Sequence, residues 1–238
     1  QALLGHADGD READNPCGCG DAADSAGTKS GSRFYWEGFI VVLPMYFGYA
    51  TLFGLQRDVK ARMGIRDDDP GTSDLFGFAV SCLYIFNLLF RFLHGIIFAR
   101  LGCRGRVIVS MGLMALAMLL LAKPNMPGGS EGIFWVMSIY ALGGMAVGTF
   151  EPNFLSCIAP LGPQCKRTAI LGIPVGISCL LIGGFFAMGP PLKVPVLAIY
   201  AAVASALLFG MGVAFRLPAS GSAGAAHEPS LRKFAADL

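Results

Sequence analysis

The sequence predicts an all-α membrane protein whose core is a six-transmembrane-helix bundle. Hydrophobic residues make up 54% of the 238 residues and charged residues only 14%, against about 25% charged in a soluble domain. Six apolar stretches follow one another along the chain, each near the roughly 20 residues that a helix needs to cross a bilayer core. The net charge of +2 is too small to indicate a nucleic-acid partner, so none is expected.

Six spans and two polar ends account for the whole chain. The spans are expected at Phe34–Leu55, Leu75–Ala99, Val107–Ala122, Ile133–Cys157, Thr168–Met188 and Val194–Phe215. Residues 1–33 are rich in Asp, Ala, Gly and Ser and are predicted to be a disordered tail. Residues 216–238 are predicted to be a polar tail or the start of a linker. Because the chain begins with Gln1 rather than Met, we expect a fragment of a longer product.

The first and third spans need only local adjustments to fit a bilayer. Glu37 lies a few residues into the first span, where it can face the interface, and Pro44 is expected to bend that helix. The third span is short, so Arg106 and Lys123 at its ends are expected to extend toward the interface.

The second span carries the most informative feature, a polar stripe of Tyr84, Asn87, Arg91 and His94. Spacings of three, four and three residues place these side chains on one face of a helix. A guanidinium in such a segment costs about 2.5–3.5 kcal/mol on insertion scales, so it is normally shielded, paired or functional. The stripe is therefore the candidate functional site.

The fourth and fifth spans are rich in glycine. Gly144 and Gly148 form one small-xxx-small pair, and Gly172 and Gly176 form another. This spacing lets helix backbones approach closely, so both pairs are expected to pack against neighbouring helices. Pro174 is expected to bend the fifth helix locally.

Glu151 in the fourth span is the natural partner of Arg91. Arg91 lies eight residues before Ala99 and Glu151 eight before Ala159, so both lie about 12 Å from the inner ends of their helices. The pair is interpreted either as a static lock between two helices or as a bridge that breaks when solute or a proton binds. An unpaired Arg91 would instead be an anion site for carboxylate, nitrate or phosphate.

The basic residues predict that both termini are cytoplasmic, since cytoplasmic loops carry the excess of Lys and Arg. With the N-terminus inside, eleven basic residues fall on the inner side and six on the outer side. The inner residues are Arg11, Lys29, Arg33, Arg100, Arg104, Arg106, Lys166, Arg167, Arg216, Arg232 and Lys233, and the outer ones are Arg57, Lys60, Arg62, Arg66, Lys123 and Lys193.

No enzyme, cofactor or metal site is predicted. Cys17 and Cys19 have no His or second Cys pair nearby to complete a zinc site and are interpreted as free thiols. His-Glu-x-x-His and Gly-x-Ser-x-Gly patterns are absent from the sequence.

The loop after the second span resembles the G-x-L-A-D-R-x-G-R-R signature of the major facilitator superfamily. Gly95, Arg100, Gly102 and Arg104 match, whereas Ala99 stands where the family usually has Asp. The resemblance covers about residues 34–215 and implies one six-helix half of a facilitator fold, built from two inverted three-helix repeats. It also implies a second six-helix half as partner, either a missing C-terminal half or a second copy.

The implied function is secondary-active or facilitative transport of a small solute by alternating access within a lipid membrane. The run from Arg91 to Arg100 resembles that of nitrate/nitrite porters, whose second-helix Arg binds the anion. This similarity implies substrate binding by Arg91, with Asn87, Tyr84 and His94 nearby. The alternative is a non-transporting six-helix scaffold in which the stripe only holds helices together.

Overall fold

The computed structural model describes residues 28–65, 70–124, 129–161, 163–190 and 192–217, and the elements within these ranges are all helical. They are α1 (Thr28–Gly54), α2 (Gln56–Arg62), α3 (Pro70–Ile97), α4 (Cys103–Leu121), α5 (Gly129–Ile158), the 3-10 turn η1 (Ala159–Leu161), α6 (Pro163–Met188) and α7 (Val196–Ala214). Of the two expected tails, residues 1–27 and 218–238 lie outside the described residues. Residues 28–33 belong to α1, so the prediction of a disordered tail is wrong for them.

The prediction of six helices long and apolar enough to cross a bilayer is confirmed for α1, α3, α4, α5, α6 and α7. α1 begins at Thr28, six residues before the expected span, because hydropathy marks the apolar part of a helix rather than its first hydrogen bond. α2 was expected to be loop. Its Val59 is buried, while Asp58 in the first turn and Arg62 in the last complement the helix dipole.

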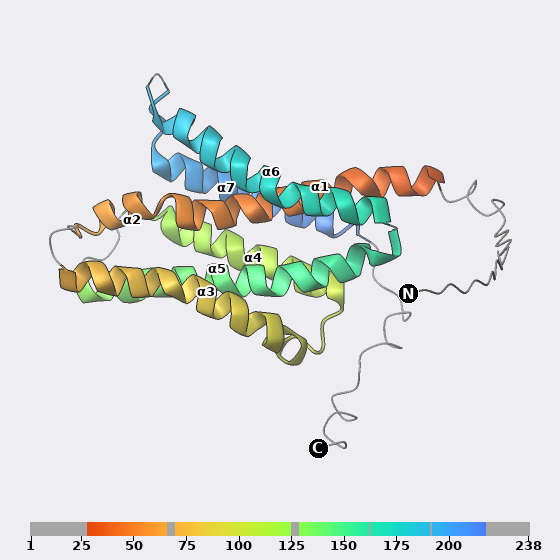
Figure 1. Cartoon of the computed structure of the whole chain (residues 1–238), viewed down its shortest axis with the longest axis horizontal. Coiled ribbons are helices and arrows are strands. Elements are labelled where there is room, and N and C mark those ends of the chain that lie inside the picture. Colours follow the sequence, from red (N-terminus) through yellow and green to blue (C-terminus); the bar gives the residue numbers. More distant parts are fainter. Residues whose placement is uncertain (1–27, 66–69, 125–128, 162, 191, 218–238) are drawn as a thin grey trace, which may run out of the picture.

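The long helices form two layers (Figure 1). α1 and α5 lie at the centre of one layer, with α6 packed against α1 and α3 packed against α5. α4 and α7 form the other layer, where they pack against each other and against α5 and α1 respectively. α3 and α6 are consequently the least buried helices, each with large apolar side chains exposed along much of its length.

The packing has the pattern of an internal repeat. Exchanging α1, α3 and α4 with α5, α6 and α7 leaves the main helix contacts unchanged: α1–α6 becomes α5–α3, and α1–α7 becomes α5–α4. Helix lengths follow the same exchange, with 27 and 30, 28 and 26, and 19 and 19 residues. Because each unit has three spans, the second unit crosses the membrane in the opposite direction to the first.

The two glycine pairs serve two different contacts. A Cβ at Gly144 would lie 2.3 Å from the backbone oxygen of Leu83, and one at Gly148 would lie 2.4 Å from that of Asn87, so α5 and α3 touch through their backbones. A Cβ at Gly172 would meet the Val42 side chain at 3.1 Å, and one at Gly176 would lie 3.0 Å from Tyr46 Cβ. Glycine thus sets the close approach of α3 to α5 and of α6 to α1.

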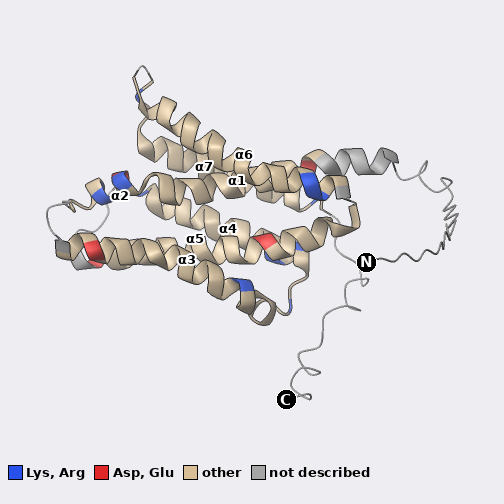
Figure 2. Ribbon diagram, in the orientation of Figure 1, with Lys and Arg blue, Asp and Glu red and all other residues tan. Residues whose placement is uncertain are grey.

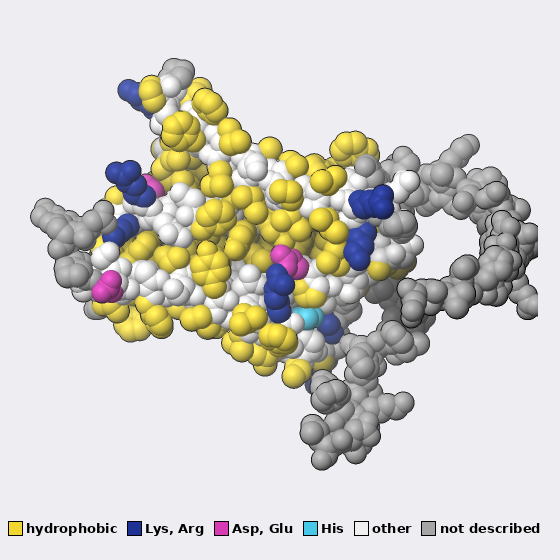
Figure 3. Space-filling view, in the orientation of Figure 1, with side chains coloured by type: hydrophobic (Ala, Val, Ile, Leu, Met, Phe, Trp, Pro, Cys, Tyr) yellow, Lys and Arg dark blue, Asp and Glu magenta, His cyan; other side chains and the backbone are white. Residues whose placement is uncertain are grey.

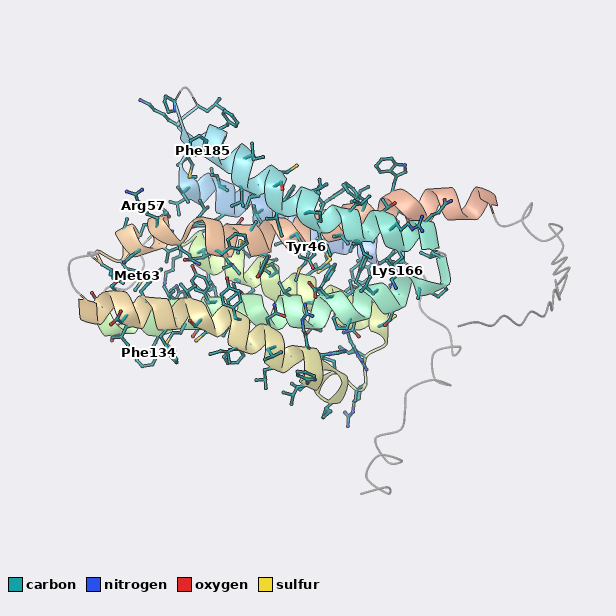
Figure 4. All side chains as sticks on the ribbon, viewed as in Figure 1. Tyr46, Arg57, Met63, Phe134, Lys166 and Phe185 are labelled. Carbon is teal, nitrogen blue, oxygen red and sulfur yellow. The ribbon has the colours of Figure 1, made fainter. Side chains whose placement is uncertain are left out.

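The two ends of the bundle are distinguished by the elements that lie at them. At the end where α2 lies, called here the α2 end, Arg62 donates from Nη1 to the Leu121 carbonyl at 2.9 Å and so caps the C-terminus of α4. α1 begins and α7 ends at the opposite end, called here the termini end (Figure 1). Charged residues gather mainly at the two ends (Figure 2), and Figure 4 places Arg57 at the α2 end and Lys166 at the termini end.

Candidate functional site

The structure brings Arg91 and Glu151 together as an ion pair between α3 and α5. Arg91 Nη2 donates to Glu151 Oε2, which is the contact that the matching depths predict. The two side chains remain 47% and 25% exposed, so the pair lies at the surface of the bundle rather than in its core. A charge pair in the middle of apolar spans that is still open on one side can be reached by a solute or by another protein segment.

Two neutral side chains extend the ion pair across three helices. Tyr46 on α1 donates its hydroxyl to Glu151 Oε1 at 2.5 Å, and Arg91 Nε donates to Asn87 Oδ1 at 3.3 Å. Tyr46, Asn87, Arg91 and Glu151 are called here the polar cluster. Tyr46 is 3% exposed, so the cluster runs from the buried centre of the layer that contains α1 and α5 outward to the half-exposed guanidinium of Arg91.

Backbone packing one turn away explains why the charged groups meet. Gly148 lies three residues before Glu151, and Asn87 lies four residues before Arg91. The missing Cβ of Gly148 lets α5 rest on the backbone of Asn87. One helical turn further along both helices, the side chains of Arg91 and Glu151 then span the gap.

A small cavity lies next to the carboxylate. It has a volume of about 130 Å³ and is bounded by α1, α5 and α6, with Tyr46 and Glu151 as its polar lining and Val42, Phe150 and Ile173 among its apolar lining. That volume is about four times the roughly 30 Å³ share of one water molecule in the liquid. The cavity is therefore of the right size for a small solute or a few waters.

The other two residues of the stripe are placed differently. His94 has Nδ1 at 3.0 Å from the Phe90 carbonyl and 3.1 Å from the Arg91 carbonyl, so this ring nitrogen is engaged within α3 itself. Tyr84 is 54% exposed on α3, toward the α2 end from Asn87. The stripe is one face of α3, but only its Asn87 and Arg91 belong to the polar cluster.

The residues that match the facilitator signature, Gly95, Arg100, Gly102 and Arg104, lie at the end of α3, in the turn that follows it and at the start of α4. Gly102 is the N-cap of α4, and the Arg104 guanidinium lies 5.6 Å from the centre of the Phe215 ring. Arg100 is exposed and Gly95 is partly buried in the last turns of α3.

Arg106, rather than a residue of the motif, holds this turn in place. Its Nε donates to the carbonyls of Phe98 at 3.1 Å and Leu101 at 2.9 Å, and its Nη1 lies 3.4 Å from Asn153 Oδ1 on α5. Arg106 thus ties the start of α4 to the end of α3 and to α5. Whether it extends toward the interface stays a prediction.

Sequence reasoning missed Tyr46 as part of the site. It lies ten residues after Trp36, the start of the apolar part of α1, or about 15 Å along the helix. That depth is close to the 12 Å estimated for Arg91 and Glu151. The signal that could have found it was a hydroxyl-bearing aromatic side chain at matching depth in a third span.

The polar cluster opens on a face that is otherwise largely hydrophobic. Figure 3 shows basic, acidic and histidine side chains meeting amid hydrophobic ones over the middle of the bundle. Comparison of the chain with protein-family models, curated proteins and solved structures found no match.

Proposed function

We propose that this chain is one six-helix bundle of a membrane transporter for small solutes, and that the polar cluster lines the solute path. The observation that carries the proposal is the half-exposed Arg91–Glu151 ion pair, which lies in the middle of two spans. A guanidinium and a carboxylate at that depth are too costly to face lipid, which favours contact with water or with a second bundle.

The helix packing supports the same function. Inverted three-helix units, with a polar site near the middle of the membrane, are a recurrent plan of secondary transporters. The main contacts here are unchanged when the two units are exchanged, and the polar cluster draws on α1 and α5, the first helix of each unit, and on α3. A second six-helix bundle, as a continuation of the chain or a second copy, would close the path on the open side. We therefore propose that the bundle is one half of a major facilitator fold.

The geometry favours a small anion as the solute. Arg91 is engaged with Glu151, so an incoming anion must compete with this carboxylate for the guanidinium. Glu151 keeps a second donor, the Tyr46 hydroxyl at 2.5 Å, when Arg91 turns to the anion. The Arg91 guanidinium would then pair with the anion when solute is bound and with Glu151 after its release.

The competing function is a scaffold in which the Arg91–Glu151 ion pair only links α3 to α5 and does not open. The observation in its favour is that Arg91 and Glu151 already have partners from three helices without any solute. The two functions predict different results for Arg91→Lys, which keeps the positive charge but loses the planar guanidinium group.

We also propose that both termini are cytoplasmic, because Lys166 lies at the termini end and Arg104, in the first turn of α4, lies beside Phe215 just after α7. Single cysteines placed in residues 56–65 should then react with an impermeant reagent from outside the cell. Reaction only from the cytoplasmic side would reverse the orientation.

The test of transport is nitrate uptake by the full-length protein in lipid vesicles. Arg91→Lys should lower the apparent affinity for nitrate at least tenfold, with the protein still folded. Glu151→Gln should lower the KM for nitrate because the competing carboxylate is gone. Arg57→Lys, at the α2 end and outside both the polar cluster and the facilitator signature, is the matched control and should leave uptake unchanged. No uptake of nitrate or of other small anions, together with an Arg91→Lys variant that only expresses poorly, would favour the scaffold.

A further inference from the structure

An apolar groove separates α6 from α7 on their halves near the α2 end. The two helices follow each other in the chain but barely touch, because α6 packs mainly on α1. The groove between them has a volume of about 360 Å³, and Phe47 of α1 contributes to its lining. Figure 1 shows α6 slanting away from α1 toward this end, and Figure 4 places Phe185 on the diverging part.

Half of the groove lining consists of glycine and alanine, and the rest is larger apolar side chains such as Phe47, Leu180 and Ile199. Gly183 and Gly184 of α6 face the groove from one side, and Ala198, Ala202 and Ala206 of α7 line the other. The three alanines repeat every four residues, so the groove follows α7 for about 12 Å. A Cβ added to Gly183 or Gly184 would meet no atom within 4 Å, in contrast to Gly172 and Gly176, which are packed against α1.

A lysine lies where the groove ends. The turn between α6 and α7 folds back so that Val194 N donates to the Ala187 carbonyl at 2.8 Å, and both of these residues line the groove. Lys193, next to Val194, is exposed in this turn. The groove thus has an apolar channel along the helices and one positive charge at its end.

We propose that this groove is a binding site for an anionic phospholipid, with one acyl chain between α6 and α7 and the phosphate at Lys193. Acyl chains run roughly along the membrane normal, as the two helices do, and the lining offers them apolar contacts alone. A lysine ammonium at the end of a span attracts an anionic headgroup. A bound chain holds the end of α6 apart from α7, which explains why two glycines there touch nothing. The site is independent of the polar cluster and of its proposed function.

The test is lipid retention by the full-length protein. Protein reconstituted in vesicles of equal parts phosphatidylglycerol and phosphatidylcholine is extracted with mild detergent, and retained lipids are counted by native mass spectrometry. We expect one retained phosphatidylglycerol per protein, reduced at least fivefold by Gly184→Leu, which fills the groove. Lys193→Gln should abolish the preference for phosphatidylglycerol while leaving some lipid bound.

Matched controls separate the site from general effects. Gly212→Leu on α7 also adds a side chain in open space but lies outside the groove, and Lys166→Gln removes a charge at the opposite end. Both should retain lipid like the unmodified protein, and all four variants should elute from gel filtration as it does. Equal retention by Gly184→Leu and Gly212→Leu would overturn the proposal. So would the loss of a dimer, rather than of lipid, on Gly184→Leu, since a second copy would then occupy the groove.

Discussion

α3 and α6 occupy equivalent places in the two three-helix units but are held in different ways. Each packs on a central helix through glycines and exposes apolar side chains on its other faces. α3 meets α5 through backbone contact at Gly144 and Gly148 and through the ion pair of Arg91. α6 meets α1 at Gly172 and Gly176, but its later glycines touch nothing.

The difference separates fixed parts of the bundle from adjustable ones. The α3–α5 contact combines backbone packing with a polar cluster, so a change there disturbs both the fold and the site. The second half of α6 has neither contact at Gly183 and Gly184, and Pro174 lies earlier in the helix, in the packed part between Gly172 and Gly176. Proline removes one helix hydrogen bond, so the helix can bend at this point. The two units thus share one packing plan, but α3 contributes Asn87 and Arg91 to the polar cluster, whereas α6 contributes no residue to it.

Gly148→Ala is expected to have the largest effect on stability. The new Cβ would lie 2.4 Å from the backbone oxygen of Asn87, which cannot move without displacing α3. We expect a loss of roughly 3 kcal/mol, at the upper end of the range for overpacking. The free energy of unfolding in mixed detergent micelles measures it.

Gly183→Ala is the counterpart on α6. Its Cβ has open space, so the gain in helix propensity of up to about 1 kcal/mol is opposed by no clash. If the two alanine variants shift stability equally, the contrast between a packed α3 and an unpacked end of α6 is wrong.

The ion pair should give the next largest effect. We expect Arg91→Ala and Glu151→Ala each to destabilise the protein and the double variant to cost less than their sum, with a coupling of about 1–2 kcal/mol. Fully buried pairs reach higher values, but both groups here are partly exposed. A double-mutant cycle of unfolding free energies gives the coupling, and strict additivity would show that the two charges do not interact in the membrane.

Tyr46→Phe should have the smallest effect, because it removes one hydroxyl and leaves the ring in place. Interhelical hydrogen bonds in membranes average about 0.6 kcal/mol, which is the loss we expect. The control is Tyr49→Phe, one turn along α1. A loss confined to Tyr46 would show that the Tyr46–Glu151 hydrogen bond ties α1 to the α3–α5 contact, whereas equal losses would exclude a special role for it.

The spans and the charged pair could be predicted from the sequence because both depend on local pattern and depth. Hydropathy reports the preference of a segment for lipid, so it identified six helices but not α2, whose single buried residue is Val59. Counting residues from the helix ends was enough to match Arg91 with Glu151. Tyr46 lies at a similar depth, but choosing it as a partner of Glu151 also requires the knowledge that α1 lies beside α5.

The glycine pairs show the limit of sequence reasoning more clearly. Their spacing predicted close packing, yet nothing in Gly144 and Gly172 distinguishes a partner in α3 from one in α1. The hydrogen bonds of Arg106 to the carbonyls of Phe98 and Leu101 could not be predicted from the position of Arg106 at a span end either. Both outcomes depend on which helices are neighbours, a property of the fold rather than of any one segment.

The claim that the polar face of α3 lines an aqueous path is tested most directly by thiol labelling at two adjacent positions. Tyr84 is 54% exposed and Ile85 50% exposed, but Tyr84 lies on the polar stripe and Ile85 on the apolar surface. In a background without other cysteines, Tyr84→Cys and Ile85→Cys are treated with a charged, membrane-impermeant maleimide in intact vesicles. We expect Tyr84→Cys to react at least tenfold faster, because only that face meets water. Equal rates, or faster reaction of Ile85→Cys, would contradict an aqueous path along the polar stripe.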